Sequence, residues 1–195
     1  MRVIYFIQSV SEHEWEVGEI IQNEIEHNPD YKDAYSKVLY AKKFVQLKSI
    51  IAQIANIVSP EDDLVIQIDA HSNTEGIAFK DVNNPDKEHC EDFVSWDCLR
   101  ESLDMLYERF QSKVLLIFVS CCSATYFSAL HSPHVKVFAA DGLLHPRRAE
   151  ELLLCFYKNF CTGKTIEESF DAMQSAFPIN DEKLRENKAL FYMYN

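Results

Sequence analysis

Two apolar runs that begin fifty residues apart constrain most strongly what this chain can fold into. Each run, at residues 64–68 and 114–119, is rich in β-branched and aliphatic side chains and long enough to be buried on both faces, as strands inside parallel sheets are. The first run leads to His71 and the second to the adjacent pair Cys121 and Cys122. Because ligands bind outside the carboxyl ends of parallel strands, we expect the histidine and a thiol to meet at that edge.

Helical patterns alternate with strand-like runs along the rest of the chain, and we interpret all 195 residues as one domain. The alternation predicts an α/β fold, a three-layer sandwich with a mostly parallel central sheet. Strands are expected at residues 3–7, 37–40, 64–72, 114–122, 134–140 and 189–194, with a short hairpin at 76–79. Helices are expected at residues 14–27, 43–58, 97–110, 123–130, 146–160 and 165–177, the last opened by a capping box of Thr165 and Glu168.

The net charge of −12 argues against nucleic acid as a partner, because phosphate binding needs a basic surface. No stretch approaches the roughly eighteen uninterrupted apolar residues that span a membrane. The apolar run at residues 3–7 lacks the longer apolar region and cleavage site of a signal peptide and is interpreted as a first strand. We therefore expect a cytoplasmic protein with neither nucleic acid nor membrane as a partner.

The six cysteines do not indicate a disulfide framework in a chain of this length without a leader, and we expect free thiols. A zinc site would have to combine His71 with Cys90, Cys98, Cys121 and Cys122. No C-x2-C pair is present, and adjacent cysteines at a strand end point in opposite directions. We expect no metal and no cofactor.

The order of these elements resembles that of the caspase-like cysteine peptidases, most closely the separase-related CHAT branch. Residues 117–125 are similar to that branch's aliphatic run, its Ser-Ala-Cys and the small hydroxyl residue that follows. On this alignment Cys122 takes the nucleophile position and Cys121 replaces the alanine, so Cys121 is expected to point to the other face, into packing. Residues 156–170 and the closing strand also resemble the branch, so the likeness covers nearly the whole chain.

The resemblance implies a cysteine endopeptidase that cleaves a protein substrate with a dyad of Cys122 and His71. The Cys122 thiolate would attack the peptide carbonyl, and His71 would protonate the departing amine. The backbone N–H groups of Ser72 and Cys122 would stabilise the oxyanion. Caspase-like enzymes usually carry glycine after the histidine, where this chain has Ser72. If the alignment slips by one residue, Cys121 and Cys122 exchange roles.

Three further residues are candidates around the dyad. In the resembling families, the position of Ser120, two before the nucleophile, helps to form the pocket for the substrate side chain that precedes the scissile bond. Asp141 either lines that pocket or caps a turn, and with the acidic surface it weakly favours arginine or lysine substrates. Asp69 lies on the same side of its strand as His71, and either orients His71 or pairs with a neighbouring Lys or Arg.

Two other functions remain open from the sequence. The first is a catalytically inactive caspase-like module that binds a partner protein through the same cleft. The second is a flavodoxin-like domain that binds a small ligand at its strand ends, although no glycine-rich phosphate loop supports it. A regulatory or activating protein is a further expected partner of the peptidase.

Overall fold

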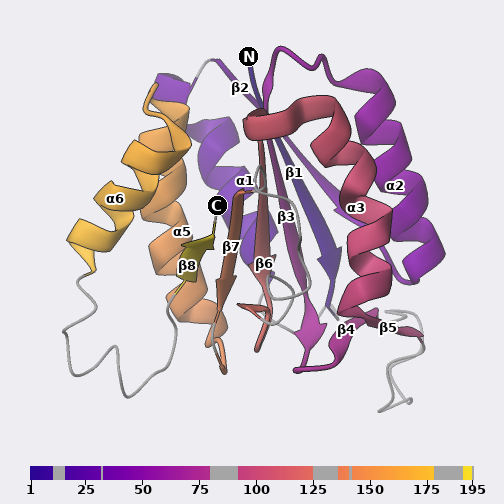
Figure 1. Ribbon diagram of the computed structural model, residues 1–195. Coiled ribbons are helices and arrows are strands. Elements are labelled where there is room, and N and C mark those ends of the chain that lie inside the picture. Colours follow the sequence, from indigo (N-terminus) through magenta and orange to yellow (C-terminus); the bar gives the residue numbers. More distant parts are fainter. Residues whose placement is uncertain are drawn as a thin grey trace.

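The computed structural model describes residues 1–10, 16–31, 33–79, 92–124, 136–140, 142–177 and 191–194. In these residues the predicted strands and helices follow one another in the predicted order (Figure 1), with β5 as an additional strand. Most of the helix predicted at residues 123–130 lies outside the described residues. The strands are β1 (Arg2–Ser9), β2 (Ala34–Tyr40), β3 (Asp63–Ser72), β4 (Gly76–Phe79), β5 (Asp92–Ser95), β6 (Val114–Val119), β7 (Lys136–Ala140) and β8 (Phe191–Tyr194). The helices are α1 (Val17–His27), α2 (Phe44–Ile57), α3 (Trp96–Phe110), α5 (Pro146–Cys161) and α6 (Ile166–Ala176), with short 3-10 turns at Pro29–Tyr31 and Gln111–Lys113.

The main sheet has the strand order β2-β1-β3-β6-β7-β8. The first five of these strands run parallel, and β8 pairs antiparallel with β7. At the carboxyl end of β3, the antiparallel pair β4 and β5 extends the sheet. This architecture confirms the predicted α/β sandwich with a mostly parallel central sheet. Since β3 and β6 are direct neighbours, their carboxyl ends lie side by side.

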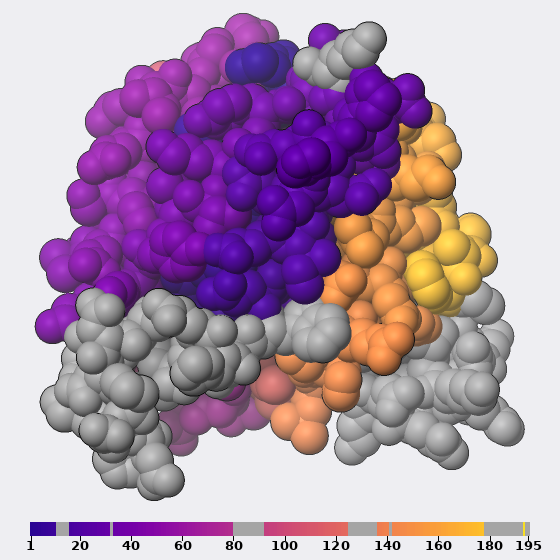
Figure 2. Space-filling model, turned by 180° about the vertical axis from the view of Figure 1, so that it is seen from behind, coloured from indigo at the N-terminus to yellow at the C-terminus, as the bar shows by residue number. Residues whose placement is uncertain are grey.

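Helices cover both faces of the sheet, with α1, α5 and α6 on one side and α2 and α3 on the other (Figure 1). Seen from behind, the surface of the N-terminal part adjoins that of α5 and α6 (Figure 2), as the packing of α1 against α5 requires. The central strands are buried on both faces, which explains their continuous apolar runs. Each fully buried Leu, Ile or Phe side chain contributes about 1.5–3 kcal/mol.

Local signals determine several helix ends. Thr165 accepts a hydrogen bond from the Glu168 N–H at 3.1 Å, and the Glu168 carboxylate accepts one from the Thr165 N–H, which confirms the predicted capping box of α6. Ser95 caps α3 in a similar way, through the Cys98 N–H.

Within the described ranges, no helix has the length and apolar character needed to cross a bilayer.

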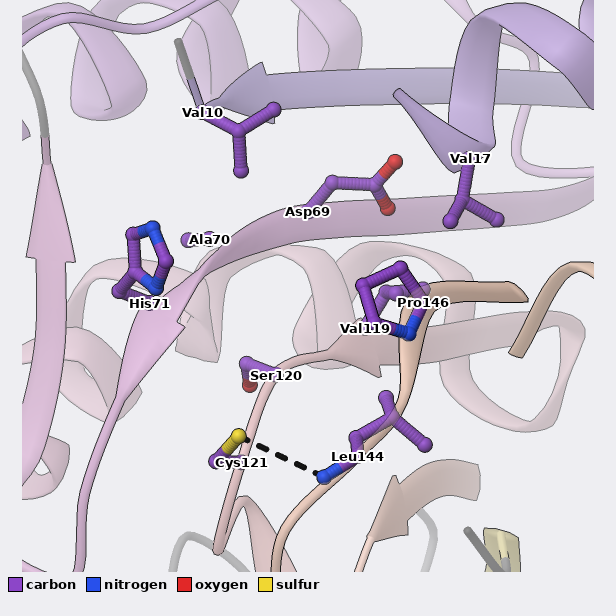
Figure 3. A pocket seen from close by; sticks show the side chains of 10 residues that line it. All are labelled: Val10, Val17, Asp69, Ala70, His71, Val119, Ser120, Cys121, Leu144 and Pro146. Carbon is purple, nitrogen blue, oxygen red and sulfur yellow. Dashed lines mark hydrogen bonds between the residues drawn. The ribbon is translucent and has the colours of Figure 1, made fainter. Parts of the chain in front are cut away.

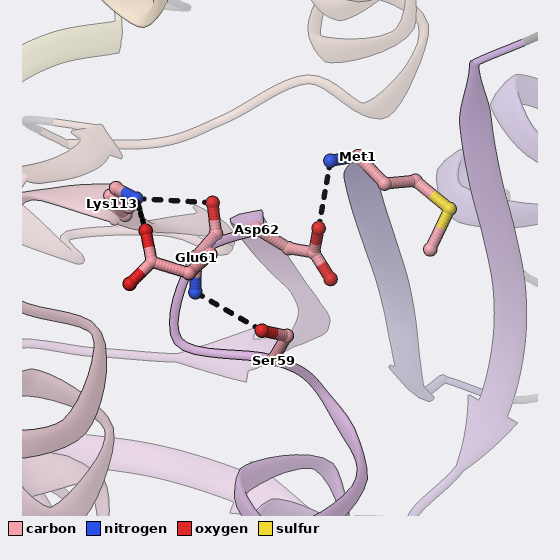
Figure 4. A network of polar contacts seen from close by, with 5 residues as sticks. All are labelled: Met1, Ser59, Glu61, Asp62 and Lys113. Atoms are coloured by element: carbon pink, nitrogen blue, oxygen red, sulfur yellow. Dashed lines mark hydrogen bonds and ion pairs between the residues drawn. The ribbon is translucent and has the colours of Figure 1, made fainter.

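The amino ends of the strands are joined by exposed ion pairs (Figure 4). The Met1 ammonium group lies 2.7 Å from an Asp62 carboxylate oxygen, and Lys113 Nζ lies 3.0 Å from a Glu61 carboxylate oxygen. Such exposed pairs contribute about 0–1 kcal/mol each. The charged side chains at this edge are therefore supporting contacts, whereas the reactive side chains lie at the opposite, carboxyl edge.

Candidate active site

A pocket of about 320 Å³ lies at the carboxyl edge, on the face that α1 and α5 cover (Figure 3). This volume falls in the lower part of the range of small-molecule sites, roughly 300–1,000 Å³. The pocket is lined by Val10, Val17, Asp69, Ala70, His71, Val119, Ser120, Cys121, Leu144 and Pro146. These residues come from the ends of β1, β3 and β6, the start of α1, and the segment that enters α5.

Sheet pairing determines which side chains meet here. Asp69 and Val119 form the last pair between β3 and β6. His71 lies two residues beyond Asp69, and Cys121 lies two residues beyond Val119, so both reach the same level above the sheet. The His71 side chain is exposed at the mouth of the pocket, whereas Asp69 is only 2% exposed. The pocket thus has a histidine at its mouth and a carboxyl group at its base.

The sequence analysis placed Cys121 in packing on the other face of the sheet, and this prediction is wrong because Cys121 lines the pocket. Val119, the last residue of β6, already faces the pocket, and the turn that follows leaves Cys121 on the same side. The Cys121 thiol is half-buried and its Sγ accepts a hydrogen bond from the Leu144 N–H at 3.4 Å (Figure 3). The structure therefore brings Cys121 and His71 into one pocket.

Cys122 is half-buried and is not one of the lining residues. Its φ of 53° lies in the left-handed region, which costs a non-glycine residue about 1–2 kcal/mol. The Cys122 N–H donates a hydrogen bond of 2.6 Å to the Gly142 carbonyl. In this structure that N–H is therefore occupied, and the predicted oxyanion role of Cys122 requires the Gly142 carbonyl to move away.

Ser72 ties the end of β3 to the end of β6, because its hydroxyl donates a hydrogen bond to the Cys121 carbonyl. The Asn73 N–H bonds to the Gly76 carbonyl, so Ser72 and Ile77 form the next, non-hydrogen-bonded pair of the β3–β4 ladder. The backbone N–H of Ser72 therefore points away from β4. Among described non-glycine residues, left-handed φ values occur at Gln111 and Cys122, so Ser72 follows the histidine without backbone strain. Its oxyanion role stays a prediction.

Ser120 is 3% exposed and its hydroxyl has no hydrogen-bond partner. Its carbonyl accepts a hydrogen bond from the Ser123 hydroxyl at 3.1 Å, and the Ser123 oxygen accepts one from the Ala140 N–H at 2.9 Å. These contacts fix the turn after β6 against β7. A buried hydroxyl without a partner costs about 1–3 kcal/mol, so the Ser120 hydroxyl is a group that a bound molecule would satisfy.

Asp69 belongs to a chain of buried polar groups beneath the pocket. Its Oδ2 accepts a hydrogen bond of 2.7 Å from the Gly18 N–H, and its Oδ1 accepts one of 2.8 Å from Gln67 Nε2. The Tyr157 hydroxyl of α5 donates to Gln67 Oε1 at 3.0 Å. Burial raises the pKa of Asp69 to about 6, although hydrogen bonds from Gln67, Gly18 and Gln8 act to lower it. The carboxyl group therefore gains or loses its proton near neutral pH.

The comparisons with known proteins bear on the fold. No family model matches the sequence, and none of the curated proteins matches it. The structure is similar to the crystal structure of the Drosophila initiator caspase Dronc, with a TM-score of 0.65. The match covers 99% of this chain and 78% of that one, at 10% sequence identity. This chain has a caspase-like fold. At this identity the likeness concerns the fold alone, and the CHAT branch and catalysis stay predictions.

Two predicted residues lie outside the described part of the chain, namely Asp141 and the candidate zinc ligand Cys90. Of the other candidate ligands, Cys98 is exposed on α3. No group of three or more His, Cys, Asp or Glu side chains in the described residues is arranged to hold a metal ion. The side chains of Asp69, His71 and Cys121 in the pocket lining offer acid–base and thiol chemistry.

Sequence reasoning missed the partners of Asp69. Gly18 can approach Asp69 closely because it has no Cβ. A Cβ at this position would lie only 2.9 Å from Phe6 Cβ and 3.1 Å from Asp69 Oδ2. Gln67 is a polar residue inside an otherwise apolar run, and a buried polar side chain needs a partner. That interruption was the available signal, since a glutamine at such a place indicates a buried polar network.

Proposed function

We propose that this chain is a caspase-like cysteine endopeptidase that cleaves a protein substrate with His71 and Cys122. The observation that carries the proposal is the ending of neighbouring strands β3 and β6, at one level, in a histidine and a pair of cysteines beside a pocket. The caspase-like fold supports the same proposal, because ligands bind at the carboxyl edge of parallel sheets.

The proposed reaction proceeds in two stages. His71 takes the proton of the thiol, and the thiolate sulfur forms a bond to the carbonyl carbon of the scissile peptide. The C–N bond then breaks, and the His71 imidazolium gives its proton to the departing amine. Water hydrolyses the resulting thioester and restores the thiol. The Ser72 N–H, which points away from β4, is a candidate donor to the oxyanion.

Different observations favour each of the two cysteines. Cys122 is favoured by the resemblance and by its left-handed backbone, since strained residues cluster at active sites. Cys121 is the competing thiol, because it lines the pocket together with His71 and its sulfur accepts the Leu144 N–H. We place the nucleophile at Cys122 and Cys121 in the pocket wall.

Alkylation of the native protein tests this proposal. The protein is treated with iodoacetamide from pH 5 to 9, and peptide mapping locates the label in the native chain and in Cys121→Ala, Cys122→Ala and His71→Ala. We expect fast labelling of Cys122 below pH 7 that is lost in His71→Ala. Fast, His71-dependent labelling of Cys121 would move the nucleophile by one residue and keep the reaction class. Slow labelling of both, with an ordinary thiol pH profile, would overturn the peptidase.

A second candidate function is an inactive caspase-like module that binds a partner protein through the same pocket. The hydrogen bond from the Cys122 N–H to the Gly142 carbonyl favours it, because that N–H is not open to a substrate. In the peptidase, an activating protein that moves the Gly142 segment would free the same N–H. Membership of the CHAT branch, a cytoplasmic location and the absence of nucleic-acid and membrane partners complete the proposal, and they rest on the sequence.

A further inference from the structure

We propose that the pocket beside the dyad selects a lysine or arginine side chain of the substrate, and that the Asp69 carboxylate binds the positive charge of this side chain. This inference rests on the proposed peptidase function and adds the class of substrate. It concerns a residue that lies two positions before His71, whose carboxylate is hydrogen-bonded to Gly18 and Gln67.

The walls of the pocket suit a long aliphatic stem. Val10, Val17, Val119 and Leu144 come from four separate segments and surround the space between mouth and base. Figure 3 shows Val17 beside the Asp69 carboxyl group, with His71 at the opposite end of the pocket. Lysine and arginine side chains pack their methylene groups against apolar surface while the charged end finds polar partners. A side chain that enters past His71 would therefore bring its charged end toward Asp69.

The lining of the pocket offers two unused acceptors, one on Asp69 and one on Ser120. Gly18, Gln67 and Gln8 donate hydrogen bonds to Asp69, and a carboxylate has about four acceptor sites, so one of them stays unused. The Ser120 hydroxyl, 3% exposed, has no partner. An ammonium or guanidinium group donates several hydrogen bonds and needs such acceptors. The unused acceptors and the apolar walls thus suit a cationic side chain with an aliphatic stem.

The charges of the pocket and of the whole chain also favour a cationic side chain. None of the ten described lining residues is a lysine or an arginine, so this part of the pocket wall brings no permanent cation to Asp69. Burying a carboxylate without a counter-charge is costly, and an incoming cation would remove that cost. An acidic substrate side chain would instead meet a carboxyl group of like charge. The net charge of −12 also attracts basic segments over longer distances.

The two other roles for Asp69 explain less of the structure. A residue that orients His71 would direct its carboxylate to the imidazole, whereas the Asp69 carboxyl group points toward Val17, away from His71 (Figure 3). Its oxygens accept hydrogen bonds from the Gly18 N–H of α1 and from Gln67. A purely structural link between α1 and β3 would account for these bonds. It would not account for a pocket that opens onto the carboxyl group, or for the unpartnered Ser120 hydroxyl.

A binding experiment without any chemistry tests the pocket. Benzamidine, a cation, and benzamide, its neutral analogue, are titrated into the native protein and followed by NMR. We expect benzamidine to bind at least about tenfold more tightly than benzamide, and Asp69→Asn to abolish the difference, because charge-assisted hydrogen bonds are the strong ones. Glu101→Gln removes the same charge from an exposed position on α3 and should change nothing. Equal binding of the two compounds would overturn the inference.

Ser120→Ala keeps the experiment decisive if Asp69→Asn fails to fold. It removes a hydroxyl that has no partner, so the protein should fold normally and bind benzamidine severalfold more weakly. If benzamidine binds Ser120→Ala and a folded Asp69→Asn as tightly as the native protein, then Asp69 and Ser120 do not bind the positive charge.

Reactive peptides then separate this inference from the proposed function. Peptidyl acyloxymethyl ketones that carry arginine, leucine or aspartate before the reactive group are compared by their rate of labelling. We expect the arginine probe to label the dyad cysteine at least about tenfold faster than the leucine probe, and the aspartate probe to be slowest. Benzamidine binding without labelling by any probe would support the pocket and overturn the peptidase. Equal labelling by all three probes would support the peptidase and overturn the selectivity.

Discussion

Asp69 is the residue on which the proposed substrate pocket depends, and its burial should make the stability of the protein depend on pH. Burial raises its pKa to about 6, above its usual value of 3.8. The folded state therefore binds the proton more tightly than the unfolded chain, and stability falls as pH rises between these two values. The loss amounts to about 3 kcal/mol at most, because one pKa unit corresponds to about 1.4 kcal/mol.

Asp69→Asn should remove this dependence. We expect the difference in unfolding free energy between the native protein and the variant to shift in favour of the variant from pH 4 to pH 7, by up to about 3 kcal/mol. Urea denaturation at several pH values measures it. Burial and the Asp69 charge hold the pKa of Tyr157 well above its usual value, so this neighbour keeps its proton from pH 4 to pH 7 and does not contribute to the difference. Parallel pH profiles would show that Asp69 titrates as it does in the unfolded chain.

Gly18 is the other residue whose identity the buried network requires. A Cβ here would lie 2.9 Å from Phe6 Cβ and 3.1 Å from Asp69 Oδ2, so Gly18→Ala forces α1 away from the sheet. We expect a loss of about 1–3 kcal/mol from overpacking, although alanine favours the helix by about 1 kcal/mol. Asn23→Ala, on the exposed face of the same helix, is the control in the same urea experiment. A Gly18→Ala protein as stable as Asn23→Ala would contradict the close contact.

At the scale of elements, the β4–β5 pair holds the end of β3 and thereby His71. His71 pairs with Ala78, and Gly76 lies so close to β5 that an added Cβ would approach the Val94 carbonyl oxygen to 2.0 Å. Gly76→Ala should therefore separate β4 from β5 and shift His71. If His71 activates the thiol, we expect His71-dependent alkylation to fall at least about tenfold, because small misplacements of catalytic groups are costly.

Thr165→Ala is the matched control for this element. It removes the N-cap of α6, outside the pocket lining, and should cost about 1 kcal/mol of stability without a change in the alkylation rate. Comparing the two variants by urea denaturation and by alkylation separates a general loss of stability from a displaced histidine. Equal alkylation rates in Gly76→Ala and Thr165→Ala would contradict the role of the hairpin.

For the molecule as a whole, the sequence predicted what depends on local pattern and missed what depends on distant contacts. The apolar runs and the Thr165 capping box predicted the strand order in the chain and the start of α6. The direction of the two cysteines depends on where β6 ends. The apolar pattern does not determine that end, because four small residues follow Val119. The Gly18 partner of Asp69 is 51 residues away, and only the folded sheet brings the two together.

The net charge of −12 acts on the whole molecule, and it leads to a last prediction about the proposed substrate class. Attraction of a cationic probe over long distances is screened by salt, since the Debye length falls from about 30 Å at 0.01 M to about 3 Å at 1 M. We expect the rate of labelling by the arginine probe to fall severalfold over this range. Labelling by neutral iodoacetamide should stay nearly constant.

Asp69→Asn separates the local charge in the pocket from this long-range attraction. The variant removes one of 31 acidic residues, so its labelling by the arginine probe should be slower at every salt concentration but fall with salt almost as steeply as in the native protein. A salt dependence lost altogether in Asp69→Asn would mean that the pocket carboxylate alone attracts the cation. A native rate that does not change with salt would mean that the acidic surface has no part in substrate capture.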